Sequence, residues 1–261
     1  MEIRESVVLN HQSPLSRAEL TADDVLRNIE VISGSLVKLQ QETEERTYYS
    51  EEVHRQLSRA GFYRLIVPRE YGGIGADLWA FDRASSMLAA GCPSTAWQAC
   101  LGQVHTYAVI ALFEKSVLSE IFSVGDFICA ATSKPQARAI RLDDGSWSIT
   151  GTCNYASAIP HASHFLSHAL YFESEETPPE LITFIVSRGA WAQLDDWGRD
   201  ILGLRGTGSH SVAIENAIVP DKYVVRSDMQ IRRMGARLAL LFQERAALPD
   251  MADCFLSSLF R

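Results

Sequence analysis

The sequence predicts an α+β protein with more than one domain, in which an all-α N-terminal half precedes a compact β domain. Two observations support this fold class. Up to about residue 125, apolar side chains recur every three or four residues, as along one face of a helix. From residue 126 onward, apolar segments are short, β-rich and separated by turn residues. We expect an N-terminal extension (1–20), a helical domain (21–125), a β domain (126–225) and a tail (226–261).

The helical half begins with a capping signal. Thr21 is followed three residues later by Asp24, the pattern in which each side chain bonds the other residue's backbone N–H at a helix start. The apolar stripe that follows predicts one helix over 21–47. A second helix is expected from Ser50 to Gly61, followed by the loop "VPREYGGIGA". Further helices are expected over 77–91, 93–113 and 114–123, with Pro93 in a first turn.

Five short segments predict the strands of the β domain. They are 127–133, 137–157, 164–172, 181–188 and 211–220. The second segment contains "RLDDGSWSI", in which an Asp-Gly turn separates two apolar runs, so we expect a β-hairpin there. Tyr155–Ser157 are expected to belong to a strand.

Composition and charge exclude several classes of protein. The net charge is −8 and the only short basic segment is "RSDMQIRR", which disfavours a nucleic-acid partner. Five scattered cysteines, none in C-x-x-C spacing, indicate reduced thiols in a cytoplasmic protein rather than disulfides or a zinc site. The N-terminal residues lack a secretory pattern, and no run of 18 apolar residues predicts a membrane segment.

Three histidines lie in "GTCNYASAIPHASHFLSHALYF" and raise the question of a metal site. On a helix, His161, His164 and His168 would align; on a strand, only His164 and His168 share a face, with His161 in a turn at Pro160. No carboxylate lies near them in sequence to complete a ligand set. We therefore predict no metal and interpret the histidines as polar residues of a cleft or a domain surface.

Two further patterns have alternative interpretations. Trp97, Leu101, His105 and Val109 are spaced four apart on a predicted helix, which favours a core face with His105 bonded to a backbone carbonyl. A planar aromatic ligand lying on this face would use the same side chains. The glycines of "LGLRGTG" precede a strand rather than a helix, so they form no dinucleotide motif. That loop and the Arg205 guanidinium are candidates to contact a phosphate or a partner domain.

Several separated motifs together carry a resemblance to a known superfamily. The segment from "GFYRLIVPREYGG" to "PSTAWQACLGQVHTYAVIALF" resembles the helical N-terminal domain of acyl-CoA dehydrogenase-like flavoproteins, and "WSITGTCNYASAIPHASHFLSHAL" with "WGRDILGLRGTGSHS" resembles their β-barrel middle domain. The forms "PSTAW" and "NYAS" are most similar to the reduced-flavin-dependent monooxygenases that hydroxylate aromatic or polycyclic substrates. The resemblance covers about residues 20–225 and implies a separate flavin reductase as partner.

The resemblance implies roles for particular residues. Trp97 and His105 would border the pocket for flavin and small-molecule substrate, and His105 would accept or steer a phenolic proton. Ser133 and Ser157 would hydrogen-bond the isoalloxazine, with Ser157 near N5 in a catalytic position. Tyr155 would form the ring wall, and Arg205 is a further cofactor contact. The cofactor would be reduced FMN or FAD in a largely dry pocket.

The last residues differ from the family pattern. Members continue into a C-terminal four-helix bundle that completes the flavin site and most of a homotetramer interface, whereas "RSDMQIRRMGARLALLFQERAALPDMADCFLSSLFR" does not resemble it. We expect the bundle to be absent, and a frameshift is one hypothesis for its loss. Without the bundle we expect little monooxygenase activity, and a homotetramer is doubtful. The alternatives are an FAD-dependent acyl-CoA dehydrogenase and an inactive fragment.

Overall fold

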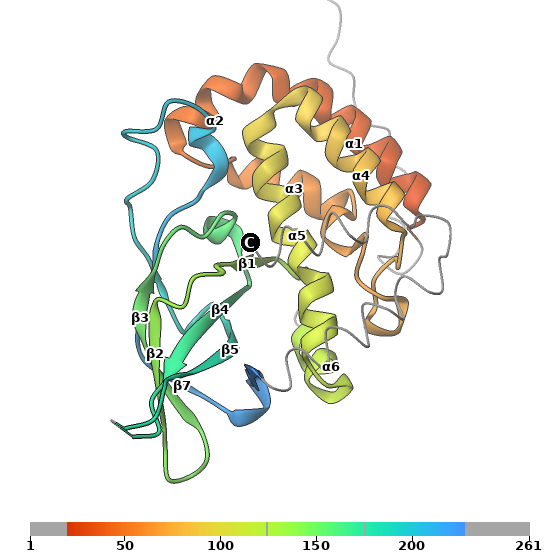
Figure 1. The fold of residues 1–261 in the computed structure, drawn as a ribbon. Coiled ribbons are helices and arrows are strands. Elements are labelled where there is room, and N and C mark those ends of the chain that lie inside the picture. The colour runs from red at the N-terminus through yellow and green to blue at the C-terminus, as the bar shows by residue number, and fades with distance from the viewer. Residues whose placement is uncertain (1–19, 124, 175, 228–261) are drawn as a thin grey trace, which may run out of the picture.

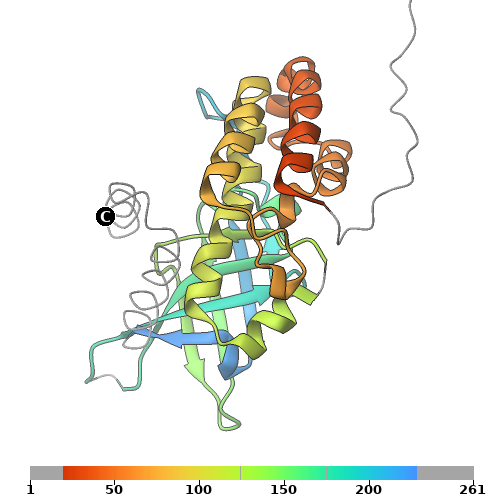
Figure 2. The same cartoon turned by 90° about the vertical axis from the view of Figure 1, so that its right-hand side faces the viewer.

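The computed structural model describes residues 20–227 except 124 and 175. The expected extension and tail, including Cys254, lie outside the described residues apart from their inner ends. Helices gather at one end of the molecule and strands at the other, and α5 runs from the helical layer down to the sheet (Figures 1 and 2). Within the described part of the chain, no helix is long and apolar enough to cross a membrane.

The helical region follows the predicted order. Its α-helices are α1 (Ala22–Leu36), α2 (Gln40–Arg46), α3 (Glu51–Arg59), α4 (Leu78–Gly91), α5 (Pro93–Leu112) and α6 (Lys115–Ser123). The capping box is confirmed: Asp24 N–H donates to Thr21 Oγ1, and Thr21 N–H donates to the Asp24 carboxylate at 2.9 Å. The single helix expected over 21–47 is wrong, because a 3₁₀ turn at Val37–Leu39 separates α1 from α2. Beyond this turn, residues at the end of α2 accept hydrogen bonds from a loop of the β domain.

The second half is a mixed sheet. Its strands are β1 (Cys129–Ala131), β2 (Ala137–Arg141), β3 (Trp147–Cys153), β4 (His164–Tyr171), β5 (Glu180–Ser187), β6 (Ala192–Gln193), β7 (Val212–Val219) and β8 (Val224–Arg226). The expected hairpin is confirmed, since β2 and β3 pair antiparallel and Gly145 takes φ +83° in the turn between them. The strand predicted over Tyr155–Ser157 is wrong, because β3 ends at Cys153. The short strands β6 and β8 were not predicted.

The sheet does not close into the expected barrel. The strand order is β6-β7-β3-β2-β4-β5-β8, with β1 pairing only with β4, so β6 and β8 are unjoined ends of the path. Both β1 and β2 run parallel to β4, while the other pairs are antiparallel. β8 pairs with β5 only from Ile182 to Phe184, so the last residues of β5 lack a strand neighbour on that side among the described residues.

Buried side chains form three clusters, and the third joins the helical region to the sheet. One lies among the helices, one fills the interior of the sheet around Trp147 and Phe165, and the third packs α5 and α6 against the sheet. In the third cluster, Phe113 and Ile121 meet Leu166 of β4 and Ile185 of β5. The boundary between the predicted domains is therefore a packed apolar seam rather than a linker.

The glycine-rich loop docks onto the helices. The backbone N–H of Arg205 donates to Glu44 Oε2 at 2.7 Å, and Gly208 N–H donates to Thr47 O at 2.7 Å. A Cβ on Gly206 would lie 2.6 Å from Thr43 Cγ2, and Gly208 takes φ +59°. Small residues are needed here because the loop backbone touches α2 and α5 directly. The sequence left two contacts open for this loop, a phosphate or a partner domain. The structure shows a contact with the helical domain.

Gly206→Ala tests this close approach. The added methyl would clash with Thr43 and Ser94, so we expect the free energy of unfolding to fall by about 1–3 kcal/mol. Gly203→Ala is the matched control in the same loop, because nothing lies within 4 Å of a Cβ at Gly203. Urea unfolding of both variants measures the effect; equal stabilities would show that the loop is not tightly docked.

Candidate functional site

A chain of hydroxyl groups links the predicted site to the interior. Trp97 on α5 donates its indole N–H to Ser157 Oγ at 3.2 Å. Ser157 Oγ lies 2.7 Å from Ser209 Oγ, which lies 2.8 Å from Thr207 Oγ1. Ser209 and Thr207 are buried, whereas Ser157 is half-buried and Trp97 is 49% exposed. Two predicted site residues from distant parts of the sequence are therefore in direct contact, with one side of the pair open.

His105 is held in one tautomer by the seam. Its Nδ1 lies 2.7 Å from the carbonyl oxygen of Cys129 on β1. Because a carbonyl only accepts, Nδ1 carries the proton and Nε2 presents a lone pair. Nε2 has no hydrogen-bond partner among the described residues. Burial lowers the pKa of His105, so the imidazole is neutral near pH 7 and able to accept a proton.

The remaining predicted residues are placed differently. Ser133 follows β1 with an exposed side chain, and no hydrogen bond within the described chain links it to Trp97, His105 or Ser157. Tyr155 is 57% exposed and lies against Trp197 with ring centroids 5.4 Å apart. Arg205 donates from Nε to Gly198 O at 2.8 Å. The structure brings Trp97 and Ser157 together but joins neither to Ser133.

The three histidines of the opening motif have separate surroundings. His161 sits in a 3₁₀ turn, and its Nε2–H donates to Tyr49 O at 3.0 Å. His164 bonds Ser163, and His168 bonds Thr183. Among the described residues, no group of three His, Cys, Asp or Glu side chains could hold a metal ion. Cys92, Cys100, Cys129 and Cys153 are free, as the cysteine pattern predicted.

His161 instead belongs to an aromatic stack between the two regions. Its ring lies parallel to Tyr49, with centroids 4.5 Å apart, and to His54, with centroids 4.6 Å apart. His54 and Tyr49 both reach the Tyr63 hydroxyl, at 3.2 and 2.8 Å. Burial is the largest cause that lowers the pKa of His161 to about 4, and it outweighs the hydrogen bond to Tyr49 O, which raises the pKa. His54 lowers the pKa further and Glu51 raises it.

Two clefts of the described structure lie away from the predicted site. One of about 290 Å³ lies between α6 and the ends of β5 and β7. Another, of about 440 Å³, lies between the loop after α3 and the end of α6. Neither is lined by Trp97, His105, Ser133 or Ser157. Trp97 and Tyr155 are 49% and 57% exposed, so the predicted site includes an open face beside α5.

Sequence reasoning missed the residues that support this face. Thr207 and Ser209 extend the hydroxyl chain, and Trp197 backs Tyr155. The small polar run "GTGSHS" was a usable signal, because buried hydroxyls need partners and this run supplies them. Its proximity to Ser157 depends on the pairing of β3 with β7, which the sequence did not reveal.

Comparison with known proteins supports the motif-based resemblance. The family "Acyl-CoA dehydrogenase, N-terminal domain" matches residues 30–114. The chain is 26% identical over 200 residues to the flavin-dependent monooxygenase oxygenase subunit HsaA of Rhodococcus jostii (strain RHA1), covering 77% of this chain and 51% of that protein. The crystal structure of the HsaA monooxygenase from M. tuberculosis superposes with a TM-score of 0.71 at 25% identity, covering 79% of this chain and 56% of that one.

The resemblance to acyl-CoA dehydrogenase-like monooxygenases is confirmed. XiaF from Streptomyces sp., solved in complex with FADH2 and glycerol, shares the fold with a TM-score of 0.74 at 21% identity, over 82% of this chain and 53% of that one. The chain spans about half the length of the curated relatives it matches. The order of helical region and sheet is thus that of the acyl-CoA dehydrogenase-like fold.

The buried histidine stack predicts acid-sensitive stability. The folded protein holds His161 neutral down to about pH 4, whereas an unfolded histidine takes up a proton near its ordinary pKa of 6.5. The contribution of His161 to the free energy of unfolding is therefore fully present above pH 6.5. It is lost as the pH falls toward 4, and the loss is on the order of 3 kcal/mol. Glu51, His54 and Arg188 are the charged or titratable groups that face it.

His161→Phe isolates this effect, because phenylalanine keeps a stacked ring and cannot titrate. We expect the slope of unfolding free energy against pH, between pH 6.5 and 4, to decrease by about one proton relative to the unaltered protein. Urea unfolding at half-unit pH steps measures it. An unchanged slope would mean that other groups cause the acid sensitivity.

Proposed function

We propose that this chain is a monooxygenase-like flavoprotein that binds reduced FMN or FAD on the open face of α5 and hydroxylates an aromatic or polyketide-type small molecule. The observation that carries the proposal is the neutral His105, whose Nδ1–H is committed to Cys129 O while Nε2 stays available. The names of the relatives, a flavin-dependent oxygenase subunit and a complex with FADH2, support the same cofactor.

The residues of the face fit a planar ring system. Trp97 and Tyr155 offer exposed aromatic surface, and the half-buried Ser157 offers a hydroxyl that is already oriented by Trp97 and Ser209. Stacking on aromatic rings and one fixed hydrogen bond are the contacts that a flavin ring uses well. We assign Ser157 to the N5 side of the ring, Ser133 and Arg205 to further cofactor contacts, and Trp97 to the substrate side.

The chemistry divides between cofactor and protein. A bound reduced flavin supplies two electrons and activates O2, so that one oxygen atom enters the substrate and the other leaves as water. His105 Nε2 accepts the phenolic proton of the substrate and so raises the electron density of the ring being hydroxylated. Burial of the His105 ring limits water at this position and lowers its pKa, which keeps the base neutral.

Two features of the family remain part of the proposal. A separate flavin reductase would deliver the reduced cofactor, in keeping with the term oxygenase subunit in a relative's name. The free cysteines fit a cytoplasmic location. The expected absence of the helical bundle concerns residues outside the described part of the chain and stays a prediction, as does the doubt about a homotetramer.

An acyl-CoA dehydrogenase is the second candidate, favoured by the match of its N-terminal domain family to residues 30–114. The two functions differ in the flavin that the purified protein keeps. A dehydrogenase retains oxidised FAD and is yellow, whereas the proposed monooxygenase takes up the reduced form. Absorbance at purification and after anaerobic addition of reduced flavin separates them.

Ser157→Ala tests the cofactor contact. Loss of one hydrogen bond predicts reduced-flavin binding that is weaker by about twofold to tenfold in anaerobic fluorescence titrations. Ser119→Ala, which removes an exposed serine hydroxyl on α6, is the matched control and leaves the affinity unchanged. Absence of flavin binding by the unaltered chain would remove the basis of the proposal and favour an inactive fragment.

His105→Gln tests the base. A glutamine amide can still donate to Cys129 O but cannot take up a proton, so phenol hydroxylation with a flavin reductase should fall by about 10²–10⁴-fold while reduced-flavin affinity is kept. His168→Gln is the control, because His168 bonds Thr183 on the sheet, apart from the predicted site. An equal loss in both variants, or none in either, would contradict the role of His105.

A further inference from the structure

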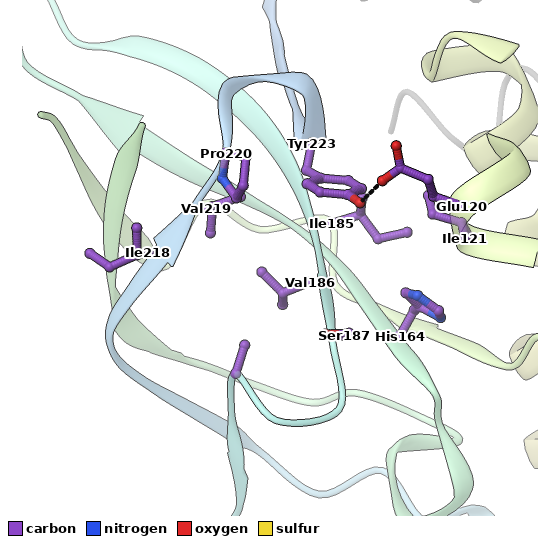
Figure 3. Close-up of a pocket in the computed structure, with 11 residues that line it drawn as sticks. Glu120, Ile121, His164, Ile185, Val186, Ser187, Ile218, Val219, Pro220 and Tyr223 are labelled. Atoms are coloured by element: carbon purple, nitrogen blue, oxygen red, sulfur yellow. Dashed lines mark hydrogen bonds between the residues drawn. The ribbon is translucent and has the colours of Figure 1, made fainter. Parts of the chain in front are cut away.

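The cleft between α6 and the sheet lies where the sheet fails to close. Its walls come from the end of β5, which β8 no longer pairs, and from the end of β7, which lies toward the other end of the strand path. Figure 3 shows Val186 and Ile185 of β5, Val219 of β7 and the Tyr223 ring around this space, with Glu120 and Ile121 of α6 beside it. The volume of about 290 Å³ is near the lower limit for small-molecule sites.

His164 adds a buried polar group to a cleft whose lining residues are mostly apolar. The side chain belongs to β4, is only 6% exposed and lines the cleft beneath α6 (Figure 3). Its Nδ1 lies 3.0 Å from Ser163 Oγ, and its Nε2 has no hydrogen-bond partner in the described part of the chain. A ligand in the cleft that hydrogen-bonds this nitrogen gains more than its apolar contacts alone.

The neighbouring hydrogen bonds determine which nitrogen of His164 carries the proton. The carbonyl oxygen of Ile128 already accepts two backbone N–H groups, from Ser163 at 2.9 Å and His164 at 3.0 Å. The Ser163 hydroxyl has one proton and two acceptors within reach, Ile128 O at 3.1 Å and His164 Nδ1 at 3.0 Å. Because the two backbone N–H groups already occupy the two lone pairs of the carbonyl oxygen, we assign the hydroxyl proton to Nδ1 of His164. Nε2 therefore carries N–H as a donor. Burial also lowers the pKa of His164 to about 4, which keeps the ring uncharged.

Among the described residues that line the cleft, the one carboxylate, Glu120, is already paired with a cation. Both Glu120 carboxylate oxygens accept from Lys222 Nζ, at 2.7 and 2.6 Å, and one also accepts from the Tyr223 hydroxyl at 2.6 Å. An ionic ligand would thus find no free opposite charge among the lining residues. The lining residues therefore favour an uncharged molecule that has one hydrogen-bond acceptor for His164 Nε2–H and an otherwise apolar ring.

We propose that this cleft is a second small-molecule site, separate from the face of α5, and that it takes a neutral ring compound bearing a carbonyl oxygen, which accepts a hydrogen bond from His164 Nε2. The site holds a ligand of roughly ten non-hydrogen atoms. It does not depend on flavin binding, because none of the residues assigned to the flavin face lines it.

A matched pair of fluorinated probes tests the proposal by ¹⁹F NMR titration of the full chain. The probes are 4-fluoroacetophenone, which carries the carbonyl, and 4-fluorocumene, which has the same number of non-hydrogen atoms without it. We expect millimolar binding of the ketone, with a preference over the hydrocarbon of about twofold to tenfold. Undetectable ketone binding, or equal binding of both probes, overturns the proposal.

Three variants locate the binding. His164→Phe keeps a ring against Phe127 but loses the N–H, so it should remove the preference for the ketone while the hydrocarbon still binds. Val186→Phe fills the cleft and should weaken both probes by more than tenfold. Ile140→Phe, on an exposed position of β2, is the control and leaves both affinities unchanged. A preference that survives in His164→Phe overturns the assignment, and this result stands even if Val186→Phe does not fold.

The flavin face must be excluded as the place of binding. Trp97→Ala removes the aromatic surface of that face without touching the cleft, so ketone affinity should stay the same. A loss in Trp97→Ala with none in His164→Phe would assign the ketone to the flavin face. That outcome would overturn the second site while leaving the proposed function intact.

Discussion

The contact between α5 and β1 is the interaction on which the rest of the structure depends. Gln103 donates to Phe127 O, and His105 donates to Cys129 O, so two side chains of one helix bond the backbone at the first strand. A Cβ on Gly102 would lie 2.8 Å from Ile128 Cγ2, which shows how closely the helix approaches the sheet region. The same bond that joins the two regions also fixes the tautomer of His105. Folding and the proposed chemistry therefore share one hydrogen bond.

Local signals in the sequence predicted most of the elements. Helix starts at Thr21, Ser50 and Asp77 are confirmed by their side-chain caps, because a capping oxygen acts within three residues of itself. The failures concern non-local contacts. The 3₁₀ break after α1 carries α2 to the loop at 205–208, and the open sheet depends on which strands meet at its ends. Neither leaves a periodic pattern within a single element.

For the candidate site too, the sequence predicted local features better than non-local contacts. A four-residue spacing placed Trp97, Leu101, His105 and Val109 on one helical face, yet Trp97 is exposed and Val109 is fully buried. Each four-residue step advances the side chain about 40° beyond a full turn, so three steps move it about 120° around the helix. Spacing thus identified the helix but not the environment of each residue. The Trp97–Ser157 contact was reached through family resemblance, whereas the cleft at His164 requires the three-dimensional arrangement of β5, β7 and α6.

The docked glycine loop has a consequence for how this fold can diversify. A Cβ at Gly206 would lie 2.6 Å from Thr43 Cγ2 and 3.0 Å from Ser94 Cβ, and Glu44 accepts a hydrogen bond from the N–H of Arg205. A larger side chain at Thr43 would therefore have to be accommodated by a displacement of the loop. The loop, α2 and α5 must therefore match one another in side-chain size. Recombination between homologues should succeed when the breakpoints keep all three segments from the same parent.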